Sequence, residues 1–239
     1  MDTSKFDKKN TKVTAHRGVS GLETENTAAA FIAAGQRSYY GVETDIHFTK
    51  DGYYVCCHDS NLERVSGKSI VIEETKLSVL EDICLYERGT TEERSYLRIP
   101  HLTDYIRICK KYGKVCVAEI KGLMPREHLE NIVKIFDGED MLENTIFIAF
   151  DFENLVILRD LLPEQKLQYL TGKIDDKLVE ELKKYRMDLD VYHEALTEEN
   201  IKMLHENGIE INCWTVDNAE RAEQLAAWGV DHITSNILE

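Results

Sequence analysis

Short apolar runs alternate along the chain with longer segments whose apolar residues recur at helical spacing. Such short runs are typical of buried strands, whereas three- and four-residue spacing is typical of amphipathic helices. Apart from a hairpin partner at 53–57, eight runs predict strands over residues 12–15, 41–49, 115–120, 146–150, 167–170, 188–192, 210–216 and 230–234. The segments between them predict helices over residues 26–35, 102–112, 127–136, 152–162, 176–185, 198–207 and 219–228.

This alternation predicts an α/β fold in which crossover helices join parallel strands. Eight strands in a chain of 239 residues favour a closed (β/α)₈ TIM barrel over an open sheet. Residues 60–98 interrupt the rhythm with charged and polar residues, so we expect a short insertion after the second strand. Few residues follow the last strand, which predicts that the last helix is missing or reduced. Because the sequence has no linker or repeat, we expect residues 1–239 to form a single domain.

The composition is that of a globular chain, with 43% hydrophobic and 31% charged residues. The 29 basic and 44 acidic side chains give a net charge of −15, which disfavours a broad nucleic-acid surface and therefore a nuclease. A local pocket can be positive on a negative protein, so this charge is compatible with a small anionic substrate.

Residues 1–10 are polar, and no uncharged apolar run approaches the roughly 18 residues of a membrane span. We therefore expect neither a signal peptide nor stable membrane insertion. The six cysteines include no C-x-x-C pair, and four of them lie in apolar runs. This usage is typical of reduced core thiols and predicts a cytoplasmic protein.

Reactive side chains lie where the predicted strands end, which is the end of a TIM barrel that carries the active site. The first strand ends in His16, Arg17 and Gly18. Arginine is suited to bidentate phosphate contact, and glycine lets the backbone approach a ligand closely. The second strand carries Glu43 and Asp45, two residues apart and therefore on one face. Because the other face is apolar and must pack against helices, we expect both carboxylates to point into the barrel.

The next strand ends carry similar residues. His47 continues the inward row of the second strand, and we expect it to support the site or to belong to the core. The hairpin partner ends in His58, followed by Asp59, and the third strand supplies Glu119 and Lys121 on one face. Lys121 is explained equally well as an ion-pair partner of the acids or as a phosphate contact.

Together these residues predict metal-assisted cleavage of a phosphate ester. Crowded carboxylates repel one another unless a cation or a proton lies between them, and the all-oxygen set of Glu43, Asp45 and Glu119 suits Mg²⁺ or Ca²⁺ rather than zinc. The cation would neutralise a phosphate oxygen and orient the nucleophile, while Arg17 and Lys121 would bind the non-bridging oxygens. The two histidines can divide general-base and general-acid work at neutral pH.

Short motifs also follow one another in a particular order along most of the chain. They are His16-Arg17-Gly18, Glu25-Asn26-Thr27, Ala30-Phe31, Glu43-x-Asp45, Thr49-Lys50-Asp51-Gly52, His58-Asp59, Leu62 with Arg64, Ile99-Pro100-x-Leu102, Glu119-x-Lys121, Phe150-Asp151, Trp214-Thr215-Val216 and Gly229-Val230-Asp231. Their order and spacing over residues 12–235 resemble the glycerophosphodiester phosphodiesterase family.

This resemblance implies a (β/α)₈ barrel and the hydrolysis of glycerophosphodiesters to an alcohol and glycerol 3-phosphate. It also implies one divalent cation, Mg²⁺ or Ca²⁺, held by Glu43, Asp45 and Glu119. The resemblance assigns His16 and His58 as the acid–base pair. In the family's reaction the glycerol 2-hydroxyl can attack phosphorus first, giving a cyclic phosphate that water then opens.

The resemblance further assigns four residues to substrate binding. Arg17 and Lys121 would hold the phosphate, while Phe150 and Trp214 would line the site. The chain departs from the family in residues 234–239, which lack the Asp and Pro often found there, and in its short polar insertion. We expect both departures to affect the choice of substrate and to leave the catalytic residues untouched.

Two alternatives compete with hydrolysis of a small glycerophosphodiester. A lysophospholipase D-like enzyme would apply the same chemistry to lipidic diesters, but it would need apolar residues at the rim, and residues 60–99 offer few contiguous ones. A non-catalytic phosphate-binding barrel would have lost a histidine or a carboxylate of the set, and none is missing here.

Overall fold

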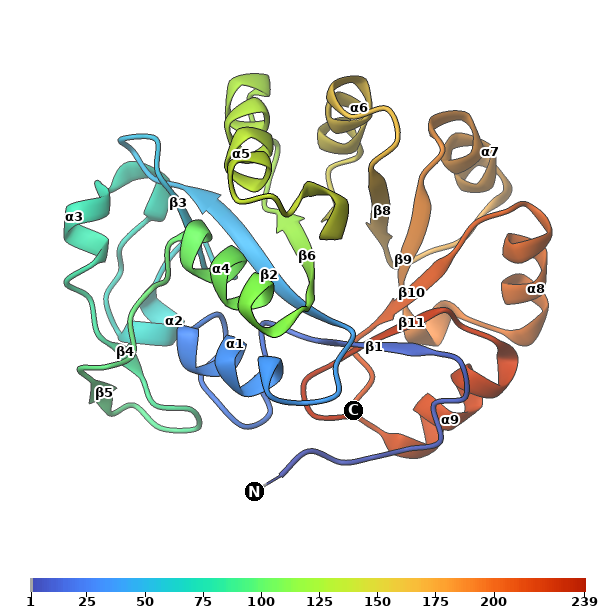
Figure 1. Cartoon of the computed structure of the whole chain (residues 1–239), viewed down its shortest axis with the longest axis horizontal. Coiled ribbons are helices and arrows are strands. Elements are labelled where there is room, and N and C mark those ends of the chain that lie inside the picture. The colour runs from blue at the N-terminus through green and yellow to red at the C-terminus, as the bar shows by residue number, and fades with distance from the viewer. Residues whose placement is uncertain (1) are drawn as a thin grey trace.

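The computed structural model describes residues 2–239, in which eight parallel strands close into a barrel (Figure 1). Neighbouring strands follow chain order, and the circle closes where β1 pairs with both β2 and β11. The barrel strands are β1 (Lys12–Ala15), β2 (Gly41–Phe48), β6 (Val115–Ile120), β7 (Thr145–Ala149), β8 (Lys166–Thr171), β9 (Asp188–Tyr192), β10 (Ile211–Trp214) and β11 (His232–Ser235). The predicted TIM barrel is confirmed, and each predicted strand corresponds to one of these.

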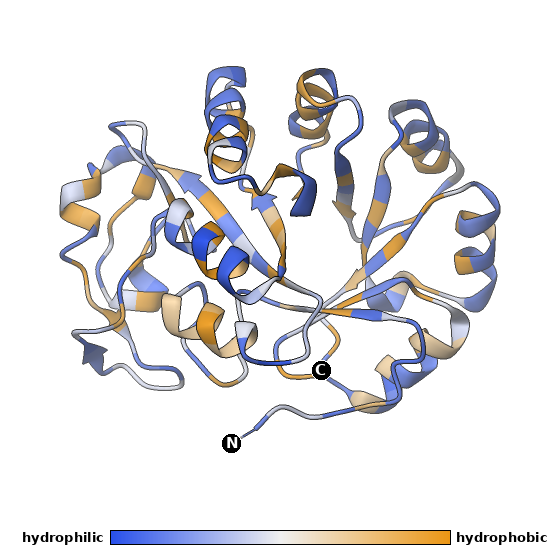
Figure 2. Cartoon of the chain, viewed as in Figure 1, coloured by the Kyte–Doolittle hydropathy of each residue, from blue (hydrophilic) through white to orange (hydrophobic). Residues whose placement is uncertain are grey.

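Helices surround the strands, and each joins one barrel strand to the next (Figure 1). They are α1 (Ala28–Gly35), α4 (Leu102–Tyr112), α5 (Arg126–Gly138), α6 (Phe152–Leu161), α7 (Asp176–Tyr185), α8 (Glu198–Glu206) and α9 (Ala219–Trp228). Several of them carry hydrophobic residues along one side and hydrophilic residues along the other (Figure 2). As predicted, no helix follows β11 within the described residues.

The start of α1 differs from its prediction by two residues. The sequence pattern places the helix start at residue 26, but Asn26 adopts a left-handed conformation with φ of 51°. Thr27 is the N-cap, and its hydroxyl accepts a hydrogen bond from the backbone N–H of Ala30. The helix therefore begins after a turn that holds Asn26 outside it.

Two apolar layers lie on opposite sides of the strands because successive side chains of a strand alternate between its faces. The larger layer packs between the strands and the helices. The smaller one fills part of the barrel interior with Val117, Ile146, Ile148 and Leu170. The interior also holds buried polar side chains, and hydrogen bonds connect Asn212 with Gln168, Asp190 and Thr234. The barrel interior therefore has an apolar part and a part in which buried polar side chains bind one another.

The insertion after β2 forms a small body beside the barrel (Figure 1). After β3 (Tyr54–Cys56), which pairs antiparallel with β2, it contains α2 (Glu63–Ser66), η1 (Ile72–Glu74), α3 (Leu77–Leu80), β4 (Leu85–Tyr86) and β5 (Glu93–Arg94). Its sequence looks polar because the apolar residues are scattered, yet it buries a cluster of its own that includes Leu62, Ile72, Leu80 and Leu97. The insertion is therefore a packed element, which can hold its side chains in fixed positions.

The remaining short elements are η2 (Leu142–Asn144), before β7, and η3 (His193–Ala195), after β9. Over residues 2–239 the helices are too short or too polar to cross a bilayer. All six cysteines are free thiols, and five of them are buried.

Asp188, at the start of β9, provides a test of stability against pH. Its Oδ1 accepts a hydrogen bond from the Glu210 backbone N–H at 2.9 Å, while burial, reinforced by the Glu210 carboxylate, raises its pKa to about 6 from 3.8. Because the folded pKa is the higher one, this group lowers the free energy of unfolding as pH rises from about 4 to about 6. Asp188→Asn keeps the acceptor oxygen and removes the charge. We expect it to raise the free energy of unfolding by about 1–2 kcal/mol near pH 7.5 and by less near pH 4.5.

Urea titrations of both proteins at the two pH values measure this difference. Asp82→Asn is the matched control, because Asp82 is exposed and its side chain makes no hydrogen bond or ion pair in the described chain. An Asp188→Asn gain that is equal at both pH values would contradict the expected linkage.

Candidate active site

A cavity of about 170 Å³ opens at the C-terminal ends of the barrel strands. Its lining includes seven of the nine residues predicted for the site: His16, Arg17, Glu43, His58, Glu119, Phe150 and Trp214. The other two contact this lining, since Asp45 lies 3.5 Å from the Arg17 guanidinium and Lys121 lies 2.8 Å from Glu119. The structure therefore brings all nine residues together in one place.

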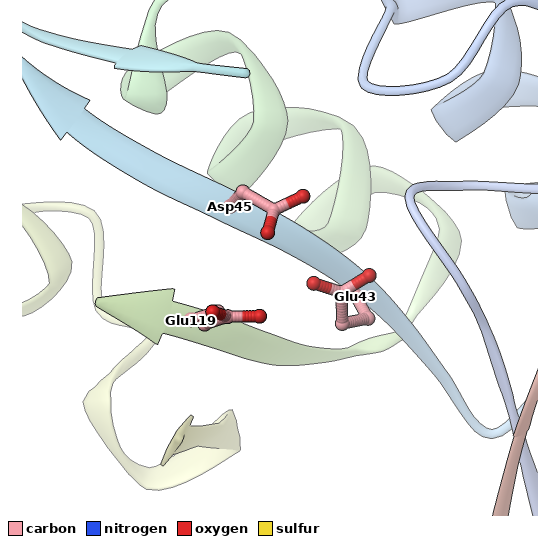
Figure 3. Close-up of side chains that lie close together, drawn as sticks. All are labelled: Glu43, Asp45 and Glu119. Carbon is pink, nitrogen blue, oxygen red and sulfur yellow. The ribbon is translucent and has the colours of Figure 1, made fainter. Parts of the chain in front are cut away.

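Three of these residues form a compact group of carboxylates (Figure 3). Glu43 and Asp45 project from β2, and Glu119 projects from β6, where it is the direct cross-strand partner of Asp45. All three are buried, and one oxygen from each lies within 4.8 Å of the others. The two-residue spacing and the parallel pairing of β2 with β6 together produce this arrangement.

Burial and neighbouring charges shift the pKa values of the three carboxylates. Burial, with repulsion from Asp45 and Glu119, raises the pKa of Glu43 well above its ordinary value. Burial, with repulsion from Asp45, raises the pKa of Glu119 to about 7. Burial would also raise the pKa of Asp45, but Lys121 and Arg17 outweigh it and hold that pKa below its usual value.

This donor set fits a divalent cation. Asp45 Oδ1 is buried and accepts no hydrogen bond, although the Lys121 ammonium lies 3.2 Å away. Mg²⁺ and Ca²⁺ prefer carboxylate oxygens, and a double positive charge would relieve the repulsion among the three acids. The described residues therefore contain an acidic group that can hold such an ion.

The basic residues beside this group contact its acids. The Lys121 ammonium lies 2.8 Å from Glu119 and 3.2 Å from Asp45, so Lys121 forms ion pairs with two of the acids. Arg17 donates its backbone N–H to Glu43 at 2.7 Å, and its guanidinium lies 3.0 Å from Glu25. Arg17 adopts a left-handed conformation with φ of 53°, which is uncommon for a residue with a side chain and occurs often at functional sites.

Gly18 is required by a contact that the sequence did not reveal. It also has a positive φ, of 74°, and a Cβ at this position would lie 2.6 Å from backbone and side-chain atoms of Ala30. Glycine is therefore required because the loop after β1 packs directly on α1.

Each residue of the Glu25-Asn26-Thr27 motif makes a different contact in or beside the site. Asn26 donates from Nδ2 to Asp45 Oδ2 at 2.8 Å and so orients that carboxylate. Thr27 caps α1, and Glu25 contacts the Arg17 guanidinium. The resemblance identified this motif, but only the structure shows what each residue contacts.

His16 is held in one tautomer by its neighbours. Its Nδ1 lies 2.7 Å from Asn236 Oδ1, which also accepts from the Ser20 hydroxyl, and the Asn236 amide is fixed by donating to Asp217. Because a carbonyl oxygen only accepts, Nδ1 carries the proton and Nε2 is free, 4.0 Å from Glu43. Burial lowers the pKa of His16 to about 4, so its ring is neutral.

Asn236 corrects the expectation that departures at the chain end leave the catalytic residues untouched. This residue lies in the segment after β11 that differs from the family pattern, yet it is the hydrogen-bond partner of His16. The local sequence carries no signal for this contact, because the two residues are 220 positions apart.

His58 has a carboxylate as its partner instead of an amide. Its Nδ1 lies 2.6 Å from Asp59 Oδ1, and its backbone carbonyl lies 3.3 Å from Nε2 of the buried His47. The other ring nitrogen of His47 contacts Glu73 of the insertion at 2.5 Å. Of the two expectations for His47, support of the site is therefore the one observed.

Aromatic residues form one wall of the cavity. Phe150 and Trp214 pack edge to face, with ring centroids 5.6 Å apart, and Phe150 is 49% exposed. Tyr192, which the sequence did not single out, also packs against Trp214, with ring centroids 5.6 Å apart, and is exposed.

Asp190 is a further acid that sequence reasoning missed. It lines the cavity from β9, is buried, and accepts a hydrogen bond from Asn212 at 3.0 Å, while its other oxygen has no partner. Burial raises its pKa well above the ordinary value, with a further contribution from Glu119. The available signal was the Asp188-x-Asp190 spacing, which repeats the pattern of the acids on β2.

Known proteins share both the sequence pattern and the fold. A sequence model of the Glycerophosphoryl diester phosphodiesterase family matches residues 16–238. A glycerophosphodiester phosphodiesterase of Caldanaerobacter subterraneus subsp. tengcongensis is 29% identical, over 95% of this chain and 94% of its own length. One from Bacillus subtilis is 26% identical, over 93% of this chain and 82% of its own.

Solved structures agree with these sequence matches. A glycerophosphodiester phosphodiesterase from Parabacteroides distasonis is 27% identical, with a TM-score of 0.80 over 98% of this chain and 94% of that one. A phosphodiesterase from Oleispira antarctica, solved in complex with the product sn-glycerol-3-phosphate, shares the fold with a TM-score of 0.88 at 24% identity, over 98% and 96% of the two chains. The chain belongs to the glycerophosphoryl diester phosphodiesterase family, and it is a hydrolase of that family.

Proposed function

We propose that the protein hydrolyses glycerophosphodiesters of small alcohols to the alcohol and glycerol 3-phosphate, using a divalent cation and two histidines. The observation that carries this proposal is the shared cavity, in which the carboxylate group lies beside both His16 and His58. Family membership supports the same reaction, and the related Oleispira enzyme binds sn-glycerol-3-phosphate as its product.

Glu43, Asp45 and Glu119 would hold the cation, which we propose to be Mg²⁺ or Ca²⁺ because all the donors are oxygens. When bound, such an ion supplies positive charge next to a phosphate oxygen and lowers the pKa of an attacking hydroxyl. Arg17 and Lys121 already lie against the acids, where they would hold the non-bridging oxygens of the substrate and stabilise the charge that develops on them.

The partners of the two histidines support different roles in proton transfer. The amide partner of His16 leaves its Nε2 unprotonated, which suits a general base for the attacking hydroxyl. Burial holds the pKa of His58 below its ordinary value, but the Asp59 carboxylate acts in the opposite direction and favours the imidazolium, so this partner suits a general acid for the departing alcohol. The hydroxyl activated by His16 can be the 2-hydroxyl of the substrate's own glycerol, with water opening the resulting cyclic phosphate afterwards.

The wall of the cavity bears on the choice of alcohol. Phe150 and Trp214 would contact the carbon atoms of the substrate, and a cavity of about 170 Å³ is small beside the roughly 300–1,000 Å³ of pockets for larger ligands. Lysophospholipids are the second candidate substrates, because Phe150 and Tyr192 are exposed beside the cavity and could contact an acyl chain.

Assays of glycerophosphocholine, glycerophosphoethanolamine and lysophosphatidylcholine, each with Mg²⁺ or Ca²⁺, test this function. We expect release of glycerol 3-phosphate from the two water-soluble diesters and loss of that release in EDTA, because the acids need a cation. Faster turnover of lysophosphatidylcholine would favour the lipidic alternative. Binding of the diesters without turnover would identify a non-catalytic barrel, and full activity after removal of all divalent cations would contradict the proposal.

We also propose that residues 1–239 form one domain with an insertion at about residues 60–98. The pairing of β1 with β11 supports a single domain, because it joins the first and last strands of the chain in one sheet. Contact of the insertion with His58, through Glu73 and His47, supports its assignment to the same domain.

A further inference from the structure

Arg64 connects the carboxylates that contact two residues of the proposed active site. It belongs to α2 of the insertion and does not line the cavity of the active site. Its Nη1 and Nη2 lie 2.9 Å and 2.7 Å from the two carboxylate oxygens of Glu25. Its Nε lies 2.6 Å from Asp59 Oδ2. One guanidinium group thus binds two carboxylates at once.

Each of these carboxylates holds a residue of the site with an oxygen that faces it. Glu25 Oε1 lies 3.0 Å from Nη1 of Arg17, and Asp59 Oδ1 lies 2.6 Å from Nδ1 of His58. The contacts therefore form an unbroken chain from Arg17 through Glu25, Arg64 and Asp59 to His58.

We propose that Arg64 is a positioning residue that fixes His58 and Arg17 relative to each other. This inference rests on the proposed function, because it takes His58 as a proton donor and Arg17 as a phosphate ligand. Its consequence is that a residue of the insertion that does not line the cavity of the active site affects both turnover and phosphate affinity.

The planar guanidinium is suited to this role in a way that other side chains are not. It presents N–H groups in a rigid fork, so Nη1 and Nη2 bind Glu25 as a pair while Nε points to Asp59. A lysine ammonium carries the same charge as a single point and has no fixed angle between its contacts. Lysine should therefore replace the charge of Arg64 without restoring the geometry.

Arg64 is the most exposed of the three side chains, since those of Glu25 and Asp59 are 21% and 28% exposed. The side chain of Arg64 is 48% exposed, and Arg64 and Glu25 both line a second cavity, of about 150 Å³, beside the insertion. Burial would raise the pKa of Glu25, but Arg64 and Arg17 outweigh it and keep that pKa below its usual value. The ion pairs with the two arginines therefore stabilise the charged carboxylate of Glu25 where it lies.

The test compares Arg64→Gln and Arg64→Lys with a matched control, Arg94→Gln. Arg94 is also an arginine of the insertion with two carboxylate partners, Glu87 and Glu92, but it contacts no residue of the site. Exposed ion pairs contribute little to folding stability, so all three variants should keep melting temperatures close to that of the wild type. Any loss of function then reports on the site and not on unfolding.

We expect Arg64→Gln to lower kcat on glycerophosphocholine by about 10- to 100-fold, because small displacements of a catalytic group have large kinetic effects. We expect its affinity for inorganic phosphate, measured by calorimetry, to fall by about 5- to 10-fold. On a logarithmic scale, Arg64→Lys should recover less than half of the loss in kcat and less than half of the loss in phosphate affinity. Arg94→Gln should leave kcat and phosphate affinity unchanged.

A double-mutant cycle separates the two arms of the network. Asp59→Asn should lower mainly kcat, and Glu25→Gln should weaken mainly phosphate binding. If Arg64 acts through these two acids, each substitution should have a much smaller effect in the Arg64→Gln background than in the wild type. Independent, multiplicative effects would overturn the inference, and so would Arg64→Gln with wild-type kcat and phosphate affinity.

Failure of the proposed function gives a different result. A wild-type protein that hydrolyses no glycerophosphodiester contradicts that function, while calorimetry with inorganic phosphate still compares Arg64→Gln with Arg94→Gln. Equal affinities in those two variants would then overturn the role of Arg64, and unequal ones would support it. If the wild type turns over substrate and Arg64→Gln does so at the same rate, only the inference is overturned.

Discussion

His16→Ala and His58→Ala are each expected to lower kcat by about 10²- to 10⁴-fold, because each variant loses one of the two groups proposed to move a proton. Binding of sn-glycerol 3-phosphate should change far less, since Arg17 and the carboxylate group remain in place. Steady-state kinetics together with calorimetry measure the two effects separately.

The choice of leaving group distinguishes the roles of the two histidines. A glycerophosphodiester of p-nitrophenol needs no proton on its departing oxygen, so His58→Ala should recover much of its rate on this substrate. His16→Ala should not recover, because activation of the attacking hydroxyl is still required. The reverse pattern would exchange the two roles.

His205→Ala is the matched control for both histidine variants. His205 lies on α8 and pairs with Asp231, a residue just before β11, far along the strands from the cavity at their C-terminal ends. Its loss should leave kcat unchanged. Either active-site variant with more than about a tenth of wild-type kcat would contradict the assignment of a proton-transfer role to that histidine.

Glu43→Gln is expected to have opposite effects on stability and on activity. Burial and two neighbouring acids raise the pKa of Glu43 well above its ordinary value, so its charge is unfavourable in the cation-free protein. The amide keeps an oxygen that can accept the Arg17 backbone N–H and removes the repulsion. Without a cation, the variant should therefore melt at a higher temperature than the wild type, by several degrees.

Addition of Mg²⁺ or Ca²⁺ should then reverse the order of the two melting temperatures. A ligand that binds only the folded state stabilises it by about 2.7 kcal/mol at 100 times its Kd, and Glu43→Gln should lose most of this gain. Its kcat/KM should also fall by about 100-fold or more, because the cation supplies charge to the transition state.

Thermal melts with EDTA and with each cation test these expectations, with Glu63→Gln as the control. Glu63 is an exposed residue of α2 that contributes only its backbone to the recorded hydrogen bonds. Equal stabilisation of wild type and Glu43→Gln by both cations would contradict the assignment of Glu43 as a ligand.

Regular alternation in the sequence was sufficient to predict the barrel. Strands paired in chain order bring consecutive strand ends together, so the acids on β2 and the acid on β6 had to meet once the fold was closed. The same strand ends supplied His16 and His58, which the resemblance assigned as the acid–base pair, and the structure places both in one cavity with Glu43 and Glu119.

Boundaries and loop conformations needed the structure. The sequence pattern places Asn26 at the start of a helix, yet it lies outside α1, where its side chain binds Asp45. Gly18 suggested contact with a ligand, whereas the position of α1 explains it. In both cases a contact between distant segments outweighed the local pattern.

The sequence by itself therefore determined the fold class and which strands carry acids, histidines and basic residues, because both follow from periodicity and from the direction of the chain. The tertiary structure alone decided which side chains contact one another between distant elements. Asn236 contacts His16, Lys121 pairs with Asp45 of the neighbouring strand, and Arg64 bridges Glu25 and Asp59. Such contacts depend on how loops of different strands converge above the barrel, and side-chain spacing along one strand carries no information about that convergence.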